Sequence, residues 1–177
     1  DRILRSCYIK QADVLQGIFL FEDKFKQEEI ERHFDFYEPL TVHESSLSPC
    51  VHSILAASID RMPKAYEQYL RTARLDLDDY NHEVHEGCHI TSMAGTWMSV
   101  VQGFGGMRVW EDGILSFKPQ IPAEWKSYSF TINFRGNIIK VYKSQTECKF
   151  FNESGNEVKM MVGNEEVSIP SNELVTV

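Results

Sequence analysis

The spacing of apolar residues changes near residue 105, and this change divides the chain into two predicted regions. Before it, apolar residues recur at the three- to four-residue spacing of a helical face, as Ile30 and Phe34 do. After Gly105 and Gly106, apolar and polar residues alternate, which is typical of half-buried strands. The pattern therefore predicts an α+β fold, with a helical region over residues 1–105 and a β domain over residues 106–177.

The helical region contains several starts and stops that the residue types predict. Proline fits the first turn of a helix because it lacks an N–H group, and Ser48 is expected to cap the helix that Pro49 begins. The expected helices cover Asp13–Phe21, Lys26–Phe36, a segment from Pro49, a segment from Pro63, and Thr91–Val101. Several of them are apolar on more than one side, which predicts packing within a larger helical domain.

The β region is expected to form an antiparallel, sandwich-like sheet. Turn signals occur at Glu111–Gly113, at Gly136-Asn137 and at Asn152–Asn156. The expected strands cover residues 107–110, 114–117, 128–134, 138–142, 147–151, 157–162, 167–169 and 174–177.

Composition and charge narrow the classes of function. The 177 residues are 42% hydrophobic and 25% charged, which is typical of a folded globular chain. A net charge of −8 argues against nucleic acid or an anionic membrane as a partner, since both need a basic face. No apolar run approaches the roughly 18 residues of a membrane span. The isolated cysteines and the polar start at residues 1–5, which does not resemble a signal peptide, predict a reduced, cytoplasmic protein.

One segment matches a zinc-hydrolase motif by its letters. His85, Glu86 and His89 fit H-E-x-x-H, in which two histidines on one helical face bind zinc. Gly87 disfavours the helix that this geometry needs. We therefore expect a polar loop and no metal here, with zinc hydrolysis as a remote alternative.

Three other segments offer groups that could bind a polar ligand. Thr41–Pro49 places an imidazole, a carboxylate and hydroxyls before a helix, which fits an anion site or an ordinary cap. Lys10 and Gln11 could bind a polyhydroxylated ligand or simply begin a solvated helix. His89 precedes hydroxyls at the start of the last helix, where anion binding and plain packing compete.

Taken in order, these segments resemble the C-terminal part of glycoside hydrolase family 65. This family includes inverting phosphorylases of maltose, trehalose, kojibiose and nigerose. The resembling segments are Ile9–Val14, Phe36–Pro49, Arg74–Asn81, Gly87–Trp97 and Gly103–Arg108.

The resemblance implies an architecture and an incomplete active site. Residues 1–105 would be the last helices of an (α/α)6 catalytic barrel, and residues 106–177 the small C-terminal β domain. The general acid of the family is a glutamate in an upstream segment similar to G-P-D-E-Y-H, which this chain lacks. We therefore expect a fragment that has no catalytic acid, is inactive alone, and needs the N-terminal part of the enzyme or associates with itself.

The resemblance also implies phosphorolysis with inversion. Inorganic phosphate is the co-substrate, no other cofactor is expected, and the products are β-glucose 1-phosphate and a sugar. Lys10 and Gln11 would bind the glucosyl unit, and Glu44 would organise the site. The residues implied for phosphate binding are Ser45, Ser46 and His89, with Thr91 and Ser92 as helpers.

Two alternatives remain open at the level of the sequence. In an inverting α-glucosidase of the same family, Glu44 would be the base that activates water. The second alternative is a non-catalytic carbohydrate-binding or interaction module, which would catalyse neither phosphorolysis nor hydrolysis. If the barrel is incomplete, apolar side chains should be exposed; the expected ones are Val14, Leu15, Ile18, Phe19, Phe21, Ile54 and Leu55.

Overall fold

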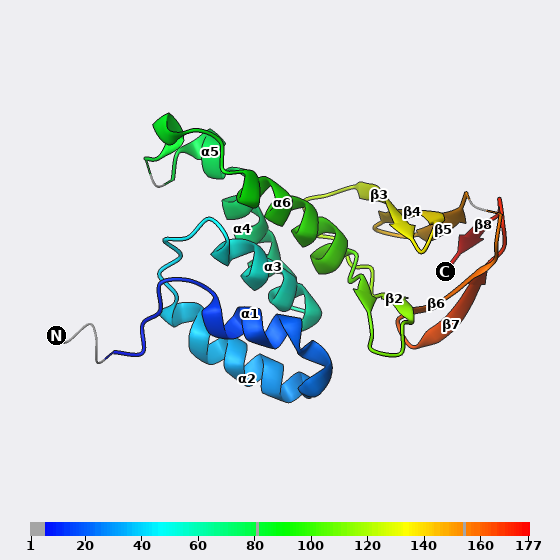
Figure 1. The fold of residues 1–177 in the computed structure, drawn as a ribbon, viewed down its shortest axis with the longest axis horizontal. Coiled ribbons are helices and arrows are strands. Elements are labelled where there is room, and N and C mark those ends of the chain that lie inside the picture. The colour runs from blue at the N-terminus through cyan, green and yellow to red at the C-terminus, as the bar shows by residue number, and fades with distance from the viewer. Residues whose placement is uncertain (1–5, 81, 154) are drawn as a thin grey trace. The chain divides into compact units, whose positions relative to one another are not determined.

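The computed structural model describes residues 6–80, 82–153 and 155–177, so the expectation made from residues 1–5 lies outside it. The chain divides into two compact units, the first ending at Gly103 and the second beginning at Phe104 (Figure 1). Within the described ranges, every helix is too short or too polar to cross a membrane.

The first unit is helical, and α3 (Ser48–Ser58) lies at its centre. This helix contacts α1, α2, α4 and α6 (Figure 1), and every residue from Ser48 to Ala57 is buried. Its burial on all sides explains why its sequence is apolar all round.

The other helices are α1 (Asp13–Leu20), α2 (Gln27–Tyr37), α4 (Met62–Ala73), α5 (Leu75–Asp78) and α6 (Ile90–Met98). Short 3-10 turns cover Glu22–Lys24, Glu38–Leu40 and Val84–Glu86, and a π-helical turn covers Ser99–Phe104.

The expected exposure of apolar side chains is wrong for the interior of this unit. Leu15 and Ile18 of α1 and Ile54 and Leu55 of α3 are all buried. The reason is that α3 is covered by neighbouring helices of the same unit, and α1 is one of them. Phe21 is 59% exposed, in agreement with the expectation, and Val14 is also exposed.

The expected cap at Ser48 is also wrong. Ser48 is the first residue of α3, Leu47 occupies the cap position, and Pro49 lies in the first turn as predicted. The Ser48 hydroxyl contacts a buried side chain instead, with its Oγ 2.9 Å from Nδ1 of His43.

The second unit contains two four-stranded sheets, with strand orders β1-β2-β6-β7 and β3-β4-β5-β8. The strands are β1 (Arg108–Val109), β2 (Leu115–Phe117), β3 (Ser127–Phe134), β4 (Asn137–Ser144), β5 (Cys148–Asn152), β6 (Val158–Val162), β7 (Glu165–Ile169) and β8 (Leu174–Thr176). The sheets pack on each other through Phe117 of β2 and Phe150 of β5, whose rings lie 5.3 Å apart. This agrees with the sandwich-like expectation, but the expectation of one antiparallel sheet is wrong. The chain changes sheets between β2 and β3, and β2 pairs with β6 in parallel.

Candidate functional site

Two distant segments of the helical unit pair through their backbones and bring Lys10 beside Glu44. Ile9 forms a parallel bridge with Thr41, and the Val42 N–H donates to the Ile9 carbonyl at 2.9 Å. The Glu44 N–H then donates to the Lys10 carbonyl at 3.3 Å. Both side chains are exposed, so this pairing presents an ammonium and a carboxylate at one place on the surface.

Gln11 is also at this place, but its amide already has a partner. Its Nε2 donates to Oδ1 of Asp13 at 2.8 Å, and the side chain is half-buried. Gln11 is therefore held at the start of α1, next to Lys10.

The loop that follows Glu44 reaches the start of α6. The Ser46 Oγ lies 3.3 Å from Oγ1 of Thr91, and the Ser45 Oγ accepts a hydrogen bond from the Leu47 N–H at 3.3 Å. The structure thus brings the hydroxyls of Ser46 and Thr91 together, whereas the Ser45 hydroxyl forms a hydrogen bond within its own loop. Ser92 differs from them, because its hydroxyl is buried and donates to the Thr72 carbonyl at 2.8 Å.

His89 precedes α6, and a carboxylate lies near each of its two ring nitrogens. Its Nδ1 lies 2.5 Å from Oδ1 of Asp76, and its backbone N–H donates to Oδ2 of the same residue at 2.9 Å. Its Nε2 lies 3.5 Å from Oε2 of Glu83. The hydrogen bond with Asp76 raises the pKa of His89 above its ordinary value, and the same bond lowers the pKa of Asp76.

Both attractive and repulsive charges would act on an anion near Thr91, because the carboxylates of Asp76 and Glu83 flank the ring of His89. The raised pKa of His89 favours the imidazolium form, and the N-terminal end of α6 adds the positive end of its backbone dipole. Glu83 opposes this, because its carboxylate lies at the ring nitrogen that faces away from Asp76. An anion that binds Nε2 must displace the Glu83 carboxylate.

Sequence reasoning missed Asp76 and Arg71. Asp76 lies in the first turn of α5, and nothing in its distance along the chain from His89 signals the pairing. The Arg71 guanidinium donates to the His43 carbonyl at 3.2 Å and so supports the loop that carries Ser45 and Ser46.

As predicted, the H-E-x-x-H segment does not form an α-helix. Val84–Glu86 is a short 3-10 turn, and Gly87 has a φ of +116°, which interrupts any helix before His89. The His85 and Glu86 side chains are largely exposed. Within the described residues, potential metal ligands cluster elsewhere, at Glu38, His43 and His52.

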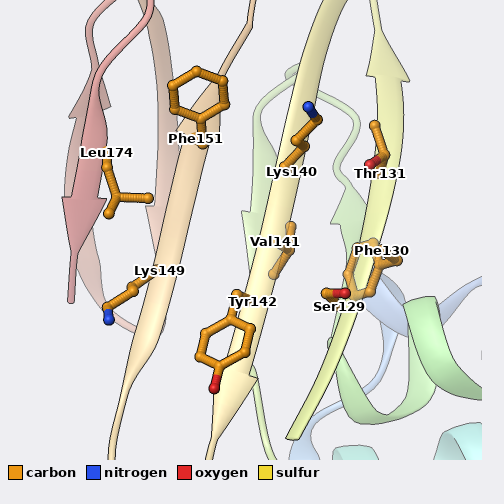
Figure 2. Close-up of a pocket in the computed structure, with 9 residues that line it drawn as sticks. All are labelled: Ser129, Phe130, Thr131, Lys140, Val141, Tyr142, Lys149, Phe151 and Leu174. Atoms are coloured by element: carbon orange, nitrogen blue, oxygen red, sulfur yellow. The ribbon is translucent and has the colours of Figure 1, made fainter.

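The β unit has a groove of its own on the β3-β4-β5-β8 sheet, with a volume of about 540 Å³ (Figure 2). Its two ammonium groups already have partners, because Lys140 pairs with Glu153 at 3.0 Å and Lys149 with Glu147 at 2.7 Å. Both ammonium groups also lie over aromatic rings, at 5.7 Å and 5.9 Å from the ring centroids. The lining residues are Ser129, Phe130, Thr131, Lys140, Val141, Tyr142, Lys149, Phe151 and Leu174. The residues expected to bind sugar or phosphate all lie in the helical unit, so we do not assign the groove to that chemistry.

Comparison with known families gives matches to both units. The model of the Glycosyl hydrolase family 65 central catalytic domain matches residues 1–98. The model of the C-terminal domain of the same family matches residues 107–169.

Individual relatives agree with these matches. The chain is 56% identical to maltose phosphorylase of Bacillus subtilis (strain 168) over 94% of its own length and 22% of that protein. It is 42% identical to α,α-trehalose phosphorylase of Thermoanaerobacter brockii over 97% of its length and 22% of that protein. A solved structure of a candidate kojibiose phosphorylase from human microbiome superimposes with a TM-score of 0.92 at 36% identity, covering 100% of this chain and 26% of that one. The chain thus spans about a fifth to a quarter of these proteins.

Proposed function

Because the chain belongs to glycoside hydrolase family 65, we propose that it forms part of an inverting α-glucoside phosphorylase. Its helical unit would be the last part of the (α/α)6 barrel, and its β unit the C-terminal domain. The reaction converts a disaccharide and inorganic phosphate into β-glucose 1-phosphate and a free sugar.

Ser45, Ser46 and His89 would bind the phosphate in this proposal. The observation that supports this assignment is the contact between Ser46 Oγ and Thr91 Oγ1, which joins the loop of Ser45 and Ser46 to the segment that contains His89. Hydroxyl donors and an imidazolium suit a phosphate because hydrogen bonds to a charged oxyanion are stronger than those between neutral groups. A rigid set of donors also holds the nucleophile in line for attack.

Lys10 and Gln11 would bind the glucosyl unit, and Glu44 would organise their side of the site. The backbone pairing of Lys10 with Glu44 supports this, because Ser45 and Ser46 directly follow Glu44. The donors for sugar and for phosphate would then lie on either side of the anomeric carbon.

The chemistry balances with one acid and one nucleophile. A carboxylic acid from the rest of the enzyme would protonate the glycosidic oxygen, and a phosphate oxygen would attack the anomeric carbon from the opposite face. The C–O bond to the leaving sugar breaks, and the resulting carboxylate is reprotonated by the proton that hydrogen phosphate loses when it forms the ester. Because phosphate is already an anion, no base has to activate it, in contrast to the water of an inverting hydrolase.

The alternative is an inverting α-glucosidase with Glu44 as the base. It remains in consideration because Glu44 is exposed beside Lys10. The names of the relatives favour phosphorolysis, since the ones described above are phosphorylases of maltose and trehalose.

We further propose that the chain works with the rest of such an enzyme in the cytoplasm. The free thiols of Cys7, Cys50, Cys88 and Cys148 support a reducing compartment. Without the rest of the enzyme, the chain would associate with itself.

The test uses steady-state kinetics of the full-length enzyme with Ser46→Ala, His89→Ala and Lys10→Ala. Loss of one hydrogen bond to the oxyanion should raise KM for phosphate by about 10- to 150-fold in the first two variants. Lys10→Ala should instead raise KM for the sugar. Ser129→Ala, which removes an exposed hydroxyl from β3, is the matched control and should change neither. Equal shifts of both constants in all three variants would contradict the division of roles, and phosphate-independent release of glucose would favour the hydrolase.

A further inference from the structure

A cluster of possible metal ligands, two of them buried, includes a residue of the loop that contains Ser45 and Ser46. Glu38 follows α2, His43 lies in the loop before α3, and His52 is in the middle of α3. Each offers one ligand atom, and these atoms lie within 4.8 Å of one another. We propose that Glu38, His43 and His52 form a Zn²⁺ site.

His52 provides the independent observation that a ligand is needed here. Its side chain is fully buried, and neither ring nitrogen has a hydrogen-bond partner among the described residues. An unpaired polar group buried in a protein is costly, so such a group calls for a partner. A metal ion bound to one ring nitrogen would supply that partner.

His43 is already oriented as a metal ligand usually is. Its Nδ1 is engaged by Ser48 Oγ at 2.9 Å, and its ring packs edge-on to that of His52 with centroids 4.4 Å apart. In metal sites, a hydrogen bond at one ring nitrogen commonly fixes the ring and leaves the other nitrogen for the ion. The hydrogen bond from Arg71 to the His43 carbonyl holds the backbone as well.

Burial favours the uncharged form of both imidazoles. Burial lowers the pKa of His43 to about 4 and that of His52 to about 3. Near neutral pH both rings are therefore uncharged and have a lone pair. Nearby Lys64 and Arg71 lower both pKa values further and would also repel a cation at the rings, whereas Glu67 acts against them at His43.

Glu38 completes a donor set that suits zinc. Two imidazoles and one carboxylate, with water as a fourth ligand, are a common arrangement for Zn²⁺. The Glu38 Oε1 now lies 3.3 Å from Nζ of Lys64 and 3.5 Å from Nε2 of Gln68. Lys64 also pairs with Glu67 at 2.9 Å, so its ammonium has a second carboxylate when an ion takes Glu38.

The ligand atoms must reach tetrahedral spacing when the ion binds. Ligands about 2.0–2.1 Å from a tetrahedral zinc lie about 3.3–3.4 Å apart, and the three ligand atoms here lie within 4.8 Å of one another. Glu38 is half-buried at the edge of the cluster and can move toward the two rings by a side-chain rotation. Competition from Lys64 is the main electrostatic cost.

The experiment measures Zn²⁺ binding to the full-length protein, purified without a histidine tag and stripped with a chelator. Titration against a chromophoric chelator should give one Zn²⁺ per chain, and Co²⁺ should give the visible absorption of a tetrahedral site. Glu38→Gln and His52→Ala each remove a direct ligand and should weaken Zn²⁺ binding by at least the roughly 10- to 100-fold that loss of an outer-shell partner costs. Glu38→Gln is the decisive variant, because it keeps the shape of the side chain if His52→Ala does not fold.

Two further variants distinguish this zinc site from a purely structural ion pair and from zinc bound at the protein surface. His85→Ala removes an exposed histidine of the H-E-x-x-H segment and should leave Zn²⁺ binding unchanged. Lys64→Met should strengthen binding, because it removes the competing cation, whereas a purely structural ion pair predicts only lower stability. The proposal is overturned if the protein binds no Zn²⁺ at millimolar concentration, if Glu38→Gln binds as well as the unmodified protein, or if binding depends on His85.

Discussion

His89 and Asp76 are joined by two contacts to one carboxylate. The ring Nδ1 of His89 lies 2.5 Å from Oδ1 of Asp76, and the backbone N–H of His89 donates to Oδ2 at 2.9 Å. The first contact sets the orientation and charge of the ring, and the second fixes the backbone at the start of α6. Asp76 is thus a positioning residue for the proposed phosphate site.

Asp76→Asn should lower the pKa of His89 toward its ordinary value of 6.5, because the hydrogen bond to Asp76 is the largest cause of its rise. The imidazolium would then be less populated near neutral pH, and phosphate binding would weaken. An NMR titration of the His89 ring measures the pKa. A pKa that does not change would show that Asp76 does not charge the ring.

The same pair predicts how stability depends on pH. Because the folded pKa of His89 is raised, its contribution is fully present below about pH 6.5 and is lost as pH rises through the raised value. Because the folded pKa of Asp76 is lowered, its contribution is present above about pH 3.8 and is lost as pH falls through the lowered value. The Tm difference between the unmodified protein and Asp76→Asn should therefore be largest between about pH 4 and 6.5. A difference that grows above pH 8 would contradict this.

Glu83→Gln should strengthen phosphate binding. Its carboxylate lies 3.5 Å from Nε2 of His89, where it competes with an anion for the imidazolium. Because the pair is partly exposed, the gain should be modest, about 2- to 5-fold in the phosphate KM. Glu86→Gln makes the same change of charge on a nearby exposed side chain and is the matched control. Equal effects of the two substitutions would point to net charge alone.

The sequence predicted elements well where one local signal determines them. The helices that contain Pro49 and Pro63 begin within one residue of the prediction, because proline is favoured in a first turn. The turn between β3 and β4 is displaced by one residue. Its central residues are Arg135 and Gly136, both with positive φ as a type I′ turn needs, and an arginine there gives no such signal.

The residues of the candidate site were chosen from the sequence alone, whereas their contacts could not be predicted from it. The order of the segments that contain Lys10, Ser46 and His89 indicated a family, and the family indicated roles. Contacts such as Ser48 with His43 and Asp76 with His89 depend on tertiary packing, which no spacing in the sequence reveals. The division of the β unit into two sheets has the same cause, since strand alternation does not say which strands pair.

The packing of α6 on α3 can be tested with one pair of glycine substitutions. A Cβ at Gly95 would lie 2.8 Å from Cβ and 2.9 Å from Sγ of buried Cys50, so Gly95→Ala should destabilise the protein by about 1–3 kcal/mol. Gly17, inside α1, has nothing within 4 Å of such a Cβ. Gly17→Ala should therefore stabilise by roughly 0.5–1 kcal/mol through helix propensity. Urea unfolding measures both, and a neutral Gly95→Ala would contradict the close contact.

The 177-residue chain alone should not phosphorolyse maltose, trehalose or kojibiose. It spans 22% of the maltose and trehalose phosphorylases described above and has no segment similar to that of the family's acid. Loss of an acid that protonates the leaving group commonly costs about 10²- to 10⁴-fold in rate. The measurement is glucose 1-phosphate release by the isolated chain, with the full-length enzyme as control. Turnover by the isolated chain would place the acid within it.

The exposed face of α6 should make the isolated chain self-associate. Ile90, Met93 and Trp97 lie three and four residues apart on one helical face and are 68%, 50% and 52% exposed. Each such side chain gains about 1.5–3 kcal/mol when it is fully buried, so together they favour a covering surface. Light scattering and binding of a hydrophobic dye should reveal association of the isolated chain, and Met93→Gln with Trp97→Gln should reduce both. Ile114→Gln, at an exposed isoleucine of the β unit, should have little effect.

In the full-length enzyme the α6 substitutions should instead lower Tm, since the rest of the barrel would cover this face. A monomeric isolated chain that binds no dye would show that the helical unit is complete by itself and would count against its place in a larger barrel.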